Sequence, residues 1–107
     1  MHEYGDPDVL KYEDIDRPSV KPGEVLIKVH AVTINRTLDL WIREGTSGYD
    51  PQLPAILGMD SAGTVESVGE GVDGFDPGDR VTAILRPPIG NGYAEFVAAS
   101  ATKTFHI

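Results

Sequence analysis

The chain has 107 residues, which is the length of one domain and leaves no room for a second of similar size. Its 17 acidic and 9 basic residues give a formal net charge of -8, and its Lys and Arg residues form no cluster, which argues against a nucleic-acid partner. With no Cys, the chain has no thiolate nucleophile, no disulfide and no Cys-ligated zinc.

The distribution of apolar residues indicates a globular domain rather than a membrane protein. No apolar run approaches the ~20 residues that a bilayer-spanning helix needs. The acidic start of the chain has neither the basic nor the apolar part of a signal peptide, so we expect a cytoplasmic location and no membrane partner. The 12 Gly and 8 Pro residues indicate many turns and a mainly β fold.

Residues 1–23 are polar and rich in turn residues, and only Val9 to Ile15 could form a short strand. The Pro-Gly turn that follows leads into the clearest strand, Glu24 to Ile34. Its alternate residues, starting with Val25, are suited to one buried face, while Lys28 lies on the other face.

A short helix is expected next, over residues 37–44. Leu38, Trp41 and Ile42 lie at i, i+3 and i+4 on one helical face, and a glycine follows as a natural end. Asn35 stands where a helix N-cap is needed. On this face Trp41 is more simply explained as a core or interface aromatic residue than as a substrate contact.

Residues 46–54 contain Tyr49 and two prolines and are expected to form a surface loop. The segment that follows reads PAILGMDSAGTVESVG, and its last part, Thr64 to Val68, alternates as a half-buried strand does. Gly58 and Gly63 allow a close approach of the backbone to a packing partner or a ligand. Asp60 between them is a candidate to face that ligand.

The remainder of the chain is expected to form short strands between turns. Asp76-Pro77-Gly78-Asp79 is typical of a type II turn, because Pro presets φ and Gly accepts a positive φ. Strands are predicted over Arg80 to Leu85 and Tyr93 to Ala98, separated by a break at residues 87–92, and Thr102 to Ile107 is expected to be extended. Five or six short strands with one helix suggest a small barrel or sandwich.

Two sequence patterns suggest ligand sites but fail on their context. Residues 69–74 match G-x-G-x-x-G, yet a Pro-Gly pair follows too soon for a helix, and the nearby acidic residues would repel a pyrophosphate. We therefore interpret them as a turn. His2, His30 and His106 do not share the spacing of metal ligands, so we expect no metal site.

Four stretches of the chain resemble, in this order, the N-terminal domain of the medium-chain dehydrogenase/reductase superfamily. They read HEYGDPDVLKYED, KPGEVLIKVHAVTINRTLDLWIREG, LPAILGMDSAGTVESVGEGVDGFDPGDRV and GNGYAEF. The resemblance spans nearly the whole chain. It implies that residues 1–107 form a GroES-like domain, a mainly β, bent and partly open β-barrel with one or two short helices. In that family the domain covers the substrate side of a cleft that a nucleotide-binding domain closes.

The resemblance also implies a type of chemistry. Zinc-dependent members carry a Cys and a Gly-His-Glu where this chain has Asn35 and Gly58-Met59-Asp60, and a thioether with an amide is a poor zinc site. The pattern is closer to the zinc-independent quinone oxidoreductases, which reduce quinones or activated alkenes with NADPH. By this resemblance Asn35, Trp41, Tyr49 and Asp60 are the candidate catalytic residues, with Asn35 also toward the nicotinamide, and no zinc is expected. Hydrogen-bond donors on these side chains would stabilise the negative charge that hydride transfer builds on the acceptor oxygen.

Several readings of the protein's role remain open at this stage. The leading one is a substrate-side fragment of a longer oxidoreductase, which we expect to be inactive by itself because the nucleotide-binding domain is absent. Its expected partner is a small-molecule quinone or enone, and the full-length protein could form a homodimer. The alternative is a standalone GroES-like binding module without catalysis. A ring-forming co-chaperonin fits less well, because the Gly-Met-Asp segment and the short helix belong to the dehydrogenase pattern.

Overall fold

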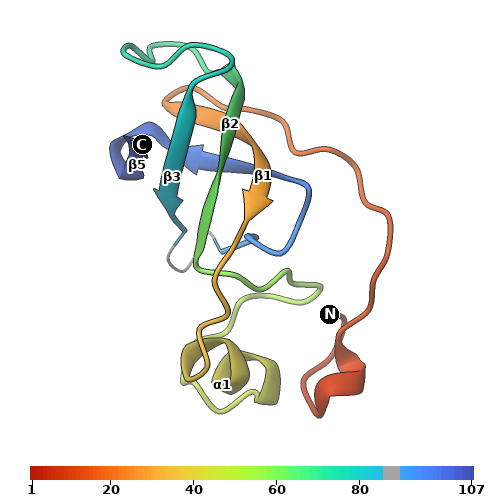
Figure 1. The fold of residues 1–107 in the computed structure, drawn as a ribbon. Helices are drawn as coiled ribbons and strands as arrows, with labels where there is room; N and C mark the ends of the chain where they lie inside the picture. The colour runs from red at the N-terminus through yellow and green to blue at the C-terminus, as the bar shows by residue number, and fades with distance from the viewer. Residues whose placement is uncertain (86–89) are drawn as a thin grey trace.

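Five antiparallel strands form a sheet in the order β4-β1-β2-β3-β5 in the computed structural model, which describes residues 1–85 and 90–107 (Figure 1). The strands are β1 Glu24–Ala31, β2 Asp60–Val68, β3 Arg80–Ile84, β4 Phe96–Ser100 and β5 Thr104–His106. The helical elements are the α-helix α1 Leu38–Glu44 and the 3-10 helices η1 Pro7–Val9 and η2 Ala101–Lys103. The sheet is not closed, so the predicted mainly β, partly open barrel is confirmed.

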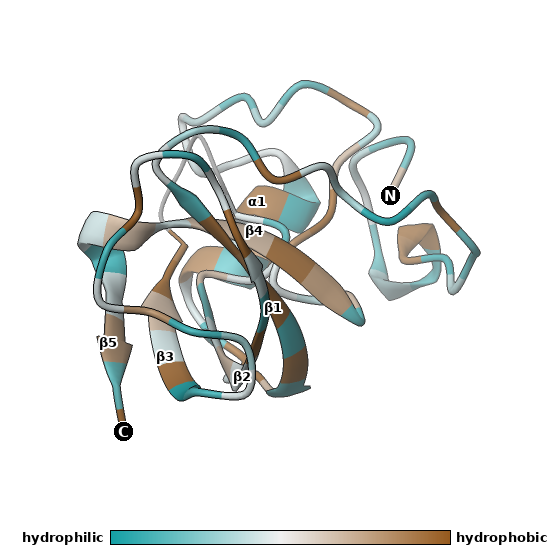
Figure 2. Ribbon diagram, turned by 90° about the horizontal axis from the view of Figure 1, so that it is seen from above, coloured by the Kyte–Doolittle hydropathy of each residue, from teal (hydrophilic) through white to brown (hydrophobic). Residues whose placement is uncertain are grey.

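The main hydrophobic core is formed by side chains that the strands of this sheet contribute. Val25 and Ile27 of β1 are fully buried, as the alternation predicts, and Val81 of β3 and Ala99 of β4 are fully buried with them. Each buried Val or Ile side chain contributes roughly 1.5–3 kcal/mol to folding. Apolar residues are prominent along β1, β3 and β4 in Figure 2. Leu26, which points to the opposite face of β1, is also buried, so β1 is covered on both faces at this point rather than exposed to solvent on one.

The glycines that the sequence singles out serve backbone packing. A Cβ atom on Gly63 in β2 would lie 2.0 Å from the carbonyl oxygen of Lys28 in β1. A Cβ atom on Gly58 would lie 2.7 Å from the Cα of Gly92. Both positions therefore need glycine because two backbones meet there.

The turns follow the local chemistry of their residues. Asp79 donates its N–H to the carbonyl of Asp76 at 3.0 Å, and Gly78 has a φ of 94°, as a type II turn requires. Residues 69–74 form a turn between β2 and β3, and the next element after them is the strand β3, not a helix. The interpretation of the G-x-G-x-x-G match as a turn is thus confirmed.

The prediction for the start of the chain is wrong, and the prediction for its end is right only over β5. Val9 to Ile15 forms no strand, because Pro7 starts η1 and residues 10–23, here called the N-terminal strap, run beside the sheet without pairing in it. The Arg17 guanidinium of the strap lies 3.9 Å from the centre of the Phe96 ring, and at the strap's end Gly23 makes backbone hydrogen bonds with Glu70 and Ala101. The terminal stretch contains η2 before β5 rather than one extended run.

The other predicted strands have shifted bounds. The first ends at Ala31 instead of Ile34, because the N–H of Thr33 is taken by Asp60. The strand expected at Tyr93 begins at Phe96, because Tyr93 donates its N–H to the carbonyl of Leu57 at 2.9 Å. The break predicted at residues 87–92 lies partly outside the described residues.

Candidate functional site

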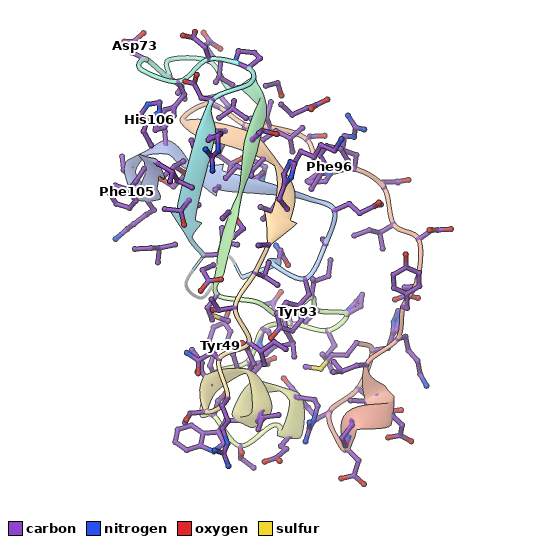
Figure 3. All side chains as sticks on the ribbon, viewed as in Figure 1. Tyr49, Asp73, Tyr93, Phe96, Phe105 and His106 are labelled. Atoms are coloured by element: carbon purple, nitrogen blue, oxygen red, sulfur yellow. The ribbon has the colours of Figure 1, made fainter. Side chains whose placement is uncertain are left out.

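A second apolar cluster lies between the sheet and α1. Its buried members include Ile42 and Leu57, and Tyr49, Met59 and Tyr93 pack against them. Figure 3 places Tyr49 and Tyr93 in this region. These residues come from α1, from the loop before β2 and from the segment before β4, so the cluster joins parts of the chain that are far apart in sequence.

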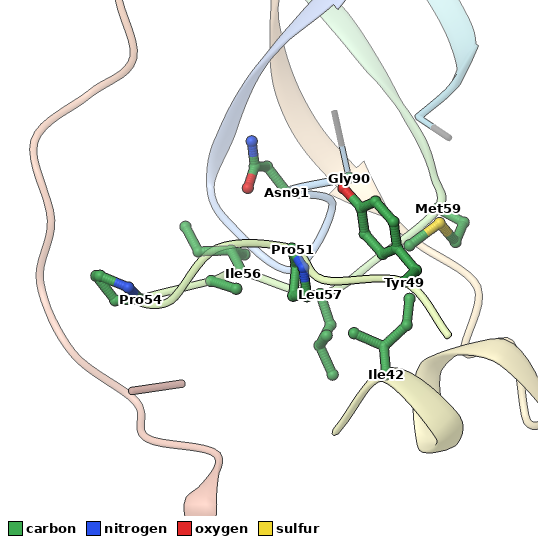
Figure 4. A pocket seen from close by; sticks show the side chains of 10 residues that line it. Ile42, Tyr49, Pro51, Pro54, Ile56, Leu57, Met59, Gly90 and Asn91 are labelled. Carbon is green, nitrogen blue, oxygen red and sulfur yellow. The ribbon is translucent and has the colours of Figure 1, made fainter. Parts of the chain in front are cut away.

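A cavity of about 140 Å³ opens beside this cluster (Figure 4). Ile42, Leu57 and Met59 give it an apolar wall, while Tyr49 and Asn91 bring polar groups to it. The ring of Tyr49 stands between Ile42 and Gly90, and its hydroxyl points toward Gly90. An engineered apolar cavity of about this size accommodates one benzene ring. The cavity is therefore large enough for one ring of a small molecule.

Asn35 is exposed at the start of α1, where its side chain caps the helix. Its Oδ1 accepts a hydrogen bond from the N–H of Leu38 at 2.8 Å, as a capping side chain does, although the N-cap position of α1 is Thr37 and not Asn35 as predicted. Its own N–H donates to Oδ2 of Asp39 at 2.9 Å. Because Oδ1 is engaged with the helix, the amino end of the amide is the part that can serve as a donor to a ligand.

Asp39 is buried, with 3% of its surface exposed. Besides the N–H of Asn35, its Oδ2 accepts a hydrogen bond from the hydroxyl of Tyr93 at 2.5 Å. Its Oδ1 has no hydrogen-bond partner among the described residues. Asp39 therefore lies in the interior, where its carboxylate is held by Tyr93 and by the segment that leads into α1.

The pKa of Tyr93 is raised well above its usual range. Burial is the largest cause, followed by the hydrogen bond to Asp39 and by the negative charges of Asp39 and Asp60. Tyr93 therefore remains a neutral hydrogen-bond donor at physiological pH.

Asp60 is half-buried at the start of β2 and holds the segment that follows β1. Its Oδ1 accepts a hydrogen bond from the N–H of Thr33 at 2.8 Å, and its Oδ2 accepts one from the Thr33 hydroxyl. Asp60 thus lies near the candidate site, with both oxygens engaged by the protein.

Trp41 lies apart from these groups, with 52% of its surface exposed. The sequence predicts Trp41 on the buried face of the helix, and this prediction is wrong. The buried residues of α1 are Asp39, Ile42 and Arg43. These three have the i, i+3, i+4 spacing of one face, but two of them are polar and so are invisible to a search for apolar periodicity. The role of Trp41 at a cleft stays a prediction.

The structure brings Asn35, Asp39 and Tyr93 into one hydrogen-bonded group and places Tyr49 at the cavity. Sequence reasoning missed Tyr93, which it treated as a strand former. Tyr93 and Asp39 are 54 positions apart, so no local pattern could have paired them.

Comparison with known proteins identifies the family of this domain. Residues 21–107 match the family described as "Alcohol dehydrogenase GroES-like domain". The chain is 42% identical over 106 residues to the quinone oxidoreductase of Rattus norvegicus, covering 98% of this chain and 31% of that protein. It is 43% identical over 101 residues to the Homo sapiens quinone oxidoreductase, covering 94% of this chain and 30% of that protein.

Solved structures agree with this relationship. The quinone oxidoreductase from Coxiella burnetii superposes with a TM-score of 0.90 at 35% identity, over 98% of this chain and 34% of that one. The Escherichia coli quinone oxidoreductase complexed with NADPH gives a TM-score of 0.88 at 31% identity, over 99% of this chain and 31% of that one. The chain spans about a third of the length of the curated relatives it matches. The chain belongs to the alcohol dehydrogenase GroES-like domain family, and its relatives include quinone oxidoreductases.

Proposed function

We propose that this chain is the substrate-side domain of a zinc-independent, NADPH-dependent oxidoreductase that transfers a hydride to a quinone or an activated alkene. The observation that carries the proposal is the 42% identity to a quinone oxidoreductase over 98% of this chain. A related quinone oxidoreductase has been solved with NADPH, which favours that cofactor. The nucleotide-binding part would lie outside residues 1–107.

The residues present do not fit the catalytic zinc of other medium-chain dehydrogenases. Asn35 uses its amide oxygen to cap α1, and Met59 packs its thioether in the apolar cluster. In the described part of the chain, no group of three or more His, Cys, Asp or Glu residues could hold a metal ion. A zinc ion prefers imidazole, thiolate and carboxylate ligands, so the donor set here argues for chemistry without it.

The side chains of this domain can assist hydride transfer by binding and by electrostatics. NADPH, when bound, supplies the hydride. The cavity beside Tyr49 and Met59 would receive an apolar ring of the acceptor. The amino end of the Asn35 amide would donate a hydrogen bond to the acceptor oxygen, on which negative charge develops. A fixed donor of this kind lowers the barrier because it need not reorient during the reaction.

A second candidate, an alcohol dehydrogenase, has a specific observation in its favour. The NAD-dependent alcohol dehydrogenase of Sulfolobus acidocaldarius is 37% identical over 101 residues, covering 90% of this chain and 28% of that protein. The poor fit of Asn35 and Met59 to zinc weighs against it. The standalone binding module stays the alternative outside catalysis.

The wider setting of the protein is also proposed. We expect a small-molecule acceptor as partner and, given the net charge of -8, no nucleic acid. No helix among the described residues is long and apolar enough to cross a membrane. A cytoplasmic location and a homodimer of the complete protein stay predictions.

The proposal is tested by assaying the complete polypeptide that carries these residues. We expect NADPH oxidation that depends on a quinone or an enone, and no NAD-dependent oxidation of simple alcohols. The 107-residue chain alone should give no turnover, although it should fold. Alcohol oxidation without quinone reduction would favour the second candidate, and no turnover with any acceptor would favour the binding module.

A further inference from the structure

The segment between β1 and α1, which carries Asn35, is anchored by carboxylates from two other parts of the chain. Asp60 at the start of β2 accepts hydrogen bonds from the N–H and the hydroxyl of Thr33, the former at 2.8 Å. Asp39 in α1 accepts one from the N–H of Asn35 at 2.9 Å. Ile34 between the two anchored residues is 76% exposed. The segment is therefore fixed by hydrogen bonds rather than by burial.

Asp39 is in turn held by Tyr93. The Tyr93 hydroxyl donates to Oδ2, the oxygen that also accepts the N–H of Asn35. A buried carboxylate is costly unless donors surround it, and Oδ1 has none among the described residues. Among the described residues, the Asp39 carboxylate has only two hydrogen-bond donors, and the Tyr93 hydroxyl is one of them. Removal of this hydroxyl would therefore change the position of Asp39.

We infer that Tyr93, acting through Asp39, and Asp60, acting through Thr33, are positioning residues that set where the Asn35 amide stands in the cleft. This inference rests on the proposed function, in which Asn35 is the donor to the acceptor oxygen. Asn35 is well suited to this control because both its N–H and its Oδ1 are tied to α1 residues. Small misplacements of a catalytic group, of the order of 1 Å, lower rates by up to about 100-fold.

The inference is tested by Tyr93→Phe in the complete polypeptide, since phenylalanine keeps the ring and removes only the hydroxyl. The matched control is Tyr4→Phe, because the Tyr4 hydroxyl also donates to an aspartate, Oδ1 of Asp50 at 3.0 Å, and neither Tyr4 nor Asp50 is among the residues that line the cavity. We expect Tyr93→Phe to lower kcat with a quinone by about 10-fold or more, with KM for NADPH changed less than about 2-fold. Tyr4→Phe should keep both values.

Amide hydrogen exchange provides a second measurement that does not depend on turnover. In Tyr93→Phe, the Asn35 amide should exchange faster while the Thr33 amide is unchanged. In Asp60→Ala, which removes the acceptor of the Thr33 N–H, the order should be reversed, with faster exchange at Thr33. A role of Tyr93 in general stability alone would accelerate both amides equally and would leave kcat unchanged at temperatures where the protein is folded.

The outcomes separate this inference from the proposed function. Wild-type turnover that Tyr93→Phe leaves unchanged, with unchanged exchange at Asn35, contradicts the positioning role and leaves the function intact. A wild-type protein that reduces no quinone contradicts the proposed function and, with it, the catalytic part of the inference. A loss of kcat in Tyr93→Phe together with faster exchange at Asn35 supports both.

Discussion

The two ends of the Asn35 amide have different roles in this account, one that the structure describes and one that we propose. The oxygen accepts the N–H of Leu38 and so stabilises the start of α1. The amino end is the donor that the proposed reaction needs. The structural role follows from the sequence, since Asn is a preferred residue before a helix, whereas the involvement of Asp39 and Tyr93 depends on contacts that only the folded chain creates.

Asn35→Asp is predicted to separate these roles. An aspartate oxygen can still cap α1, so the free energy of unfolding should change by less than about 0.5 kcal/mol. The amino donor is lost and a negative charge faces the acceptor oxygen, so kcat should fall by roughly 100- to 1,000-fold. Chemical denaturation and steady-state kinetics on the same preparations would measure both effects. A variant with nearly full activity would show that Asn35 is not the donor.

The raised pKa of Tyr93 predicts how stability depends on alkaline pH. Because the folded-state pKa lies above the unfolded value of about 10, the neutral phenol is favoured in the folded state. Its contribution is fully present below about pH 10 and is lost as the pH rises from there through the folded pKa. Urea unfolding of wild type and Tyr93→Phe across this range should show a steeper loss in the wild type. Parallel curves would argue against the buried hydrogen bond.

At the scale of elements, the close pairing of β1 with β2 determines where Asp60 and Thr33 meet. The sequence predicts β1 and the turn at residues 76–79 well, because strand alternation and turn chemistry are local properties. It misplaces β4, because the backbone of Tyr93 pairs with Leu57 rather than continuing the strand. It also misplaces Trp41, because the buried face of α1 includes polar residues whose partners lie elsewhere in the chain.

Gly63→Ala should disrupt this pairing. Its Cβ would lie 2.0 Å from the Lys28 carbonyl oxygen, so β1 and β2 would have to separate, at a cost of about 3 kcal/mol in the free energy of unfolding. Gly71→Ala is the matched control, because it has open space around it and only a positive φ, and should cost about 1 kcal/mol. Denaturant unfolding would compare them, and equal losses would show that the close approach is not limiting.

At the scale of the whole molecule, the domain combines a sheet, a short helix and the loop before β2 around the cavity that we propose as one side of the substrate site. The cavity beside Tyr49 is lined by residues of α1 and of the loop before β2, and Asn35, just before α1, is hydrogen-bonded to Leu38 and Asp39. The family, the mainly β fold and the relation to quinone oxidoreductases could be predicted from sequence motifs. The hydrogen-bonded group of Asn35, Asp39 and Tyr93 could not, because it joins distant segments.

The central claim, quinone reduction without zinc, is tested most directly by measuring NADPH-dependent quinone reduction by the complete polypeptide before and after exhaustive treatment with a zinc chelator. Because Met59 and Asn35 offer no suitable zinc ligands, we predict the same rate in both preparations and no stoichiometric zinc by elemental analysis. One bound zinc per chain, with activity that is lost on chelation and restored by added zinc, would contradict the account.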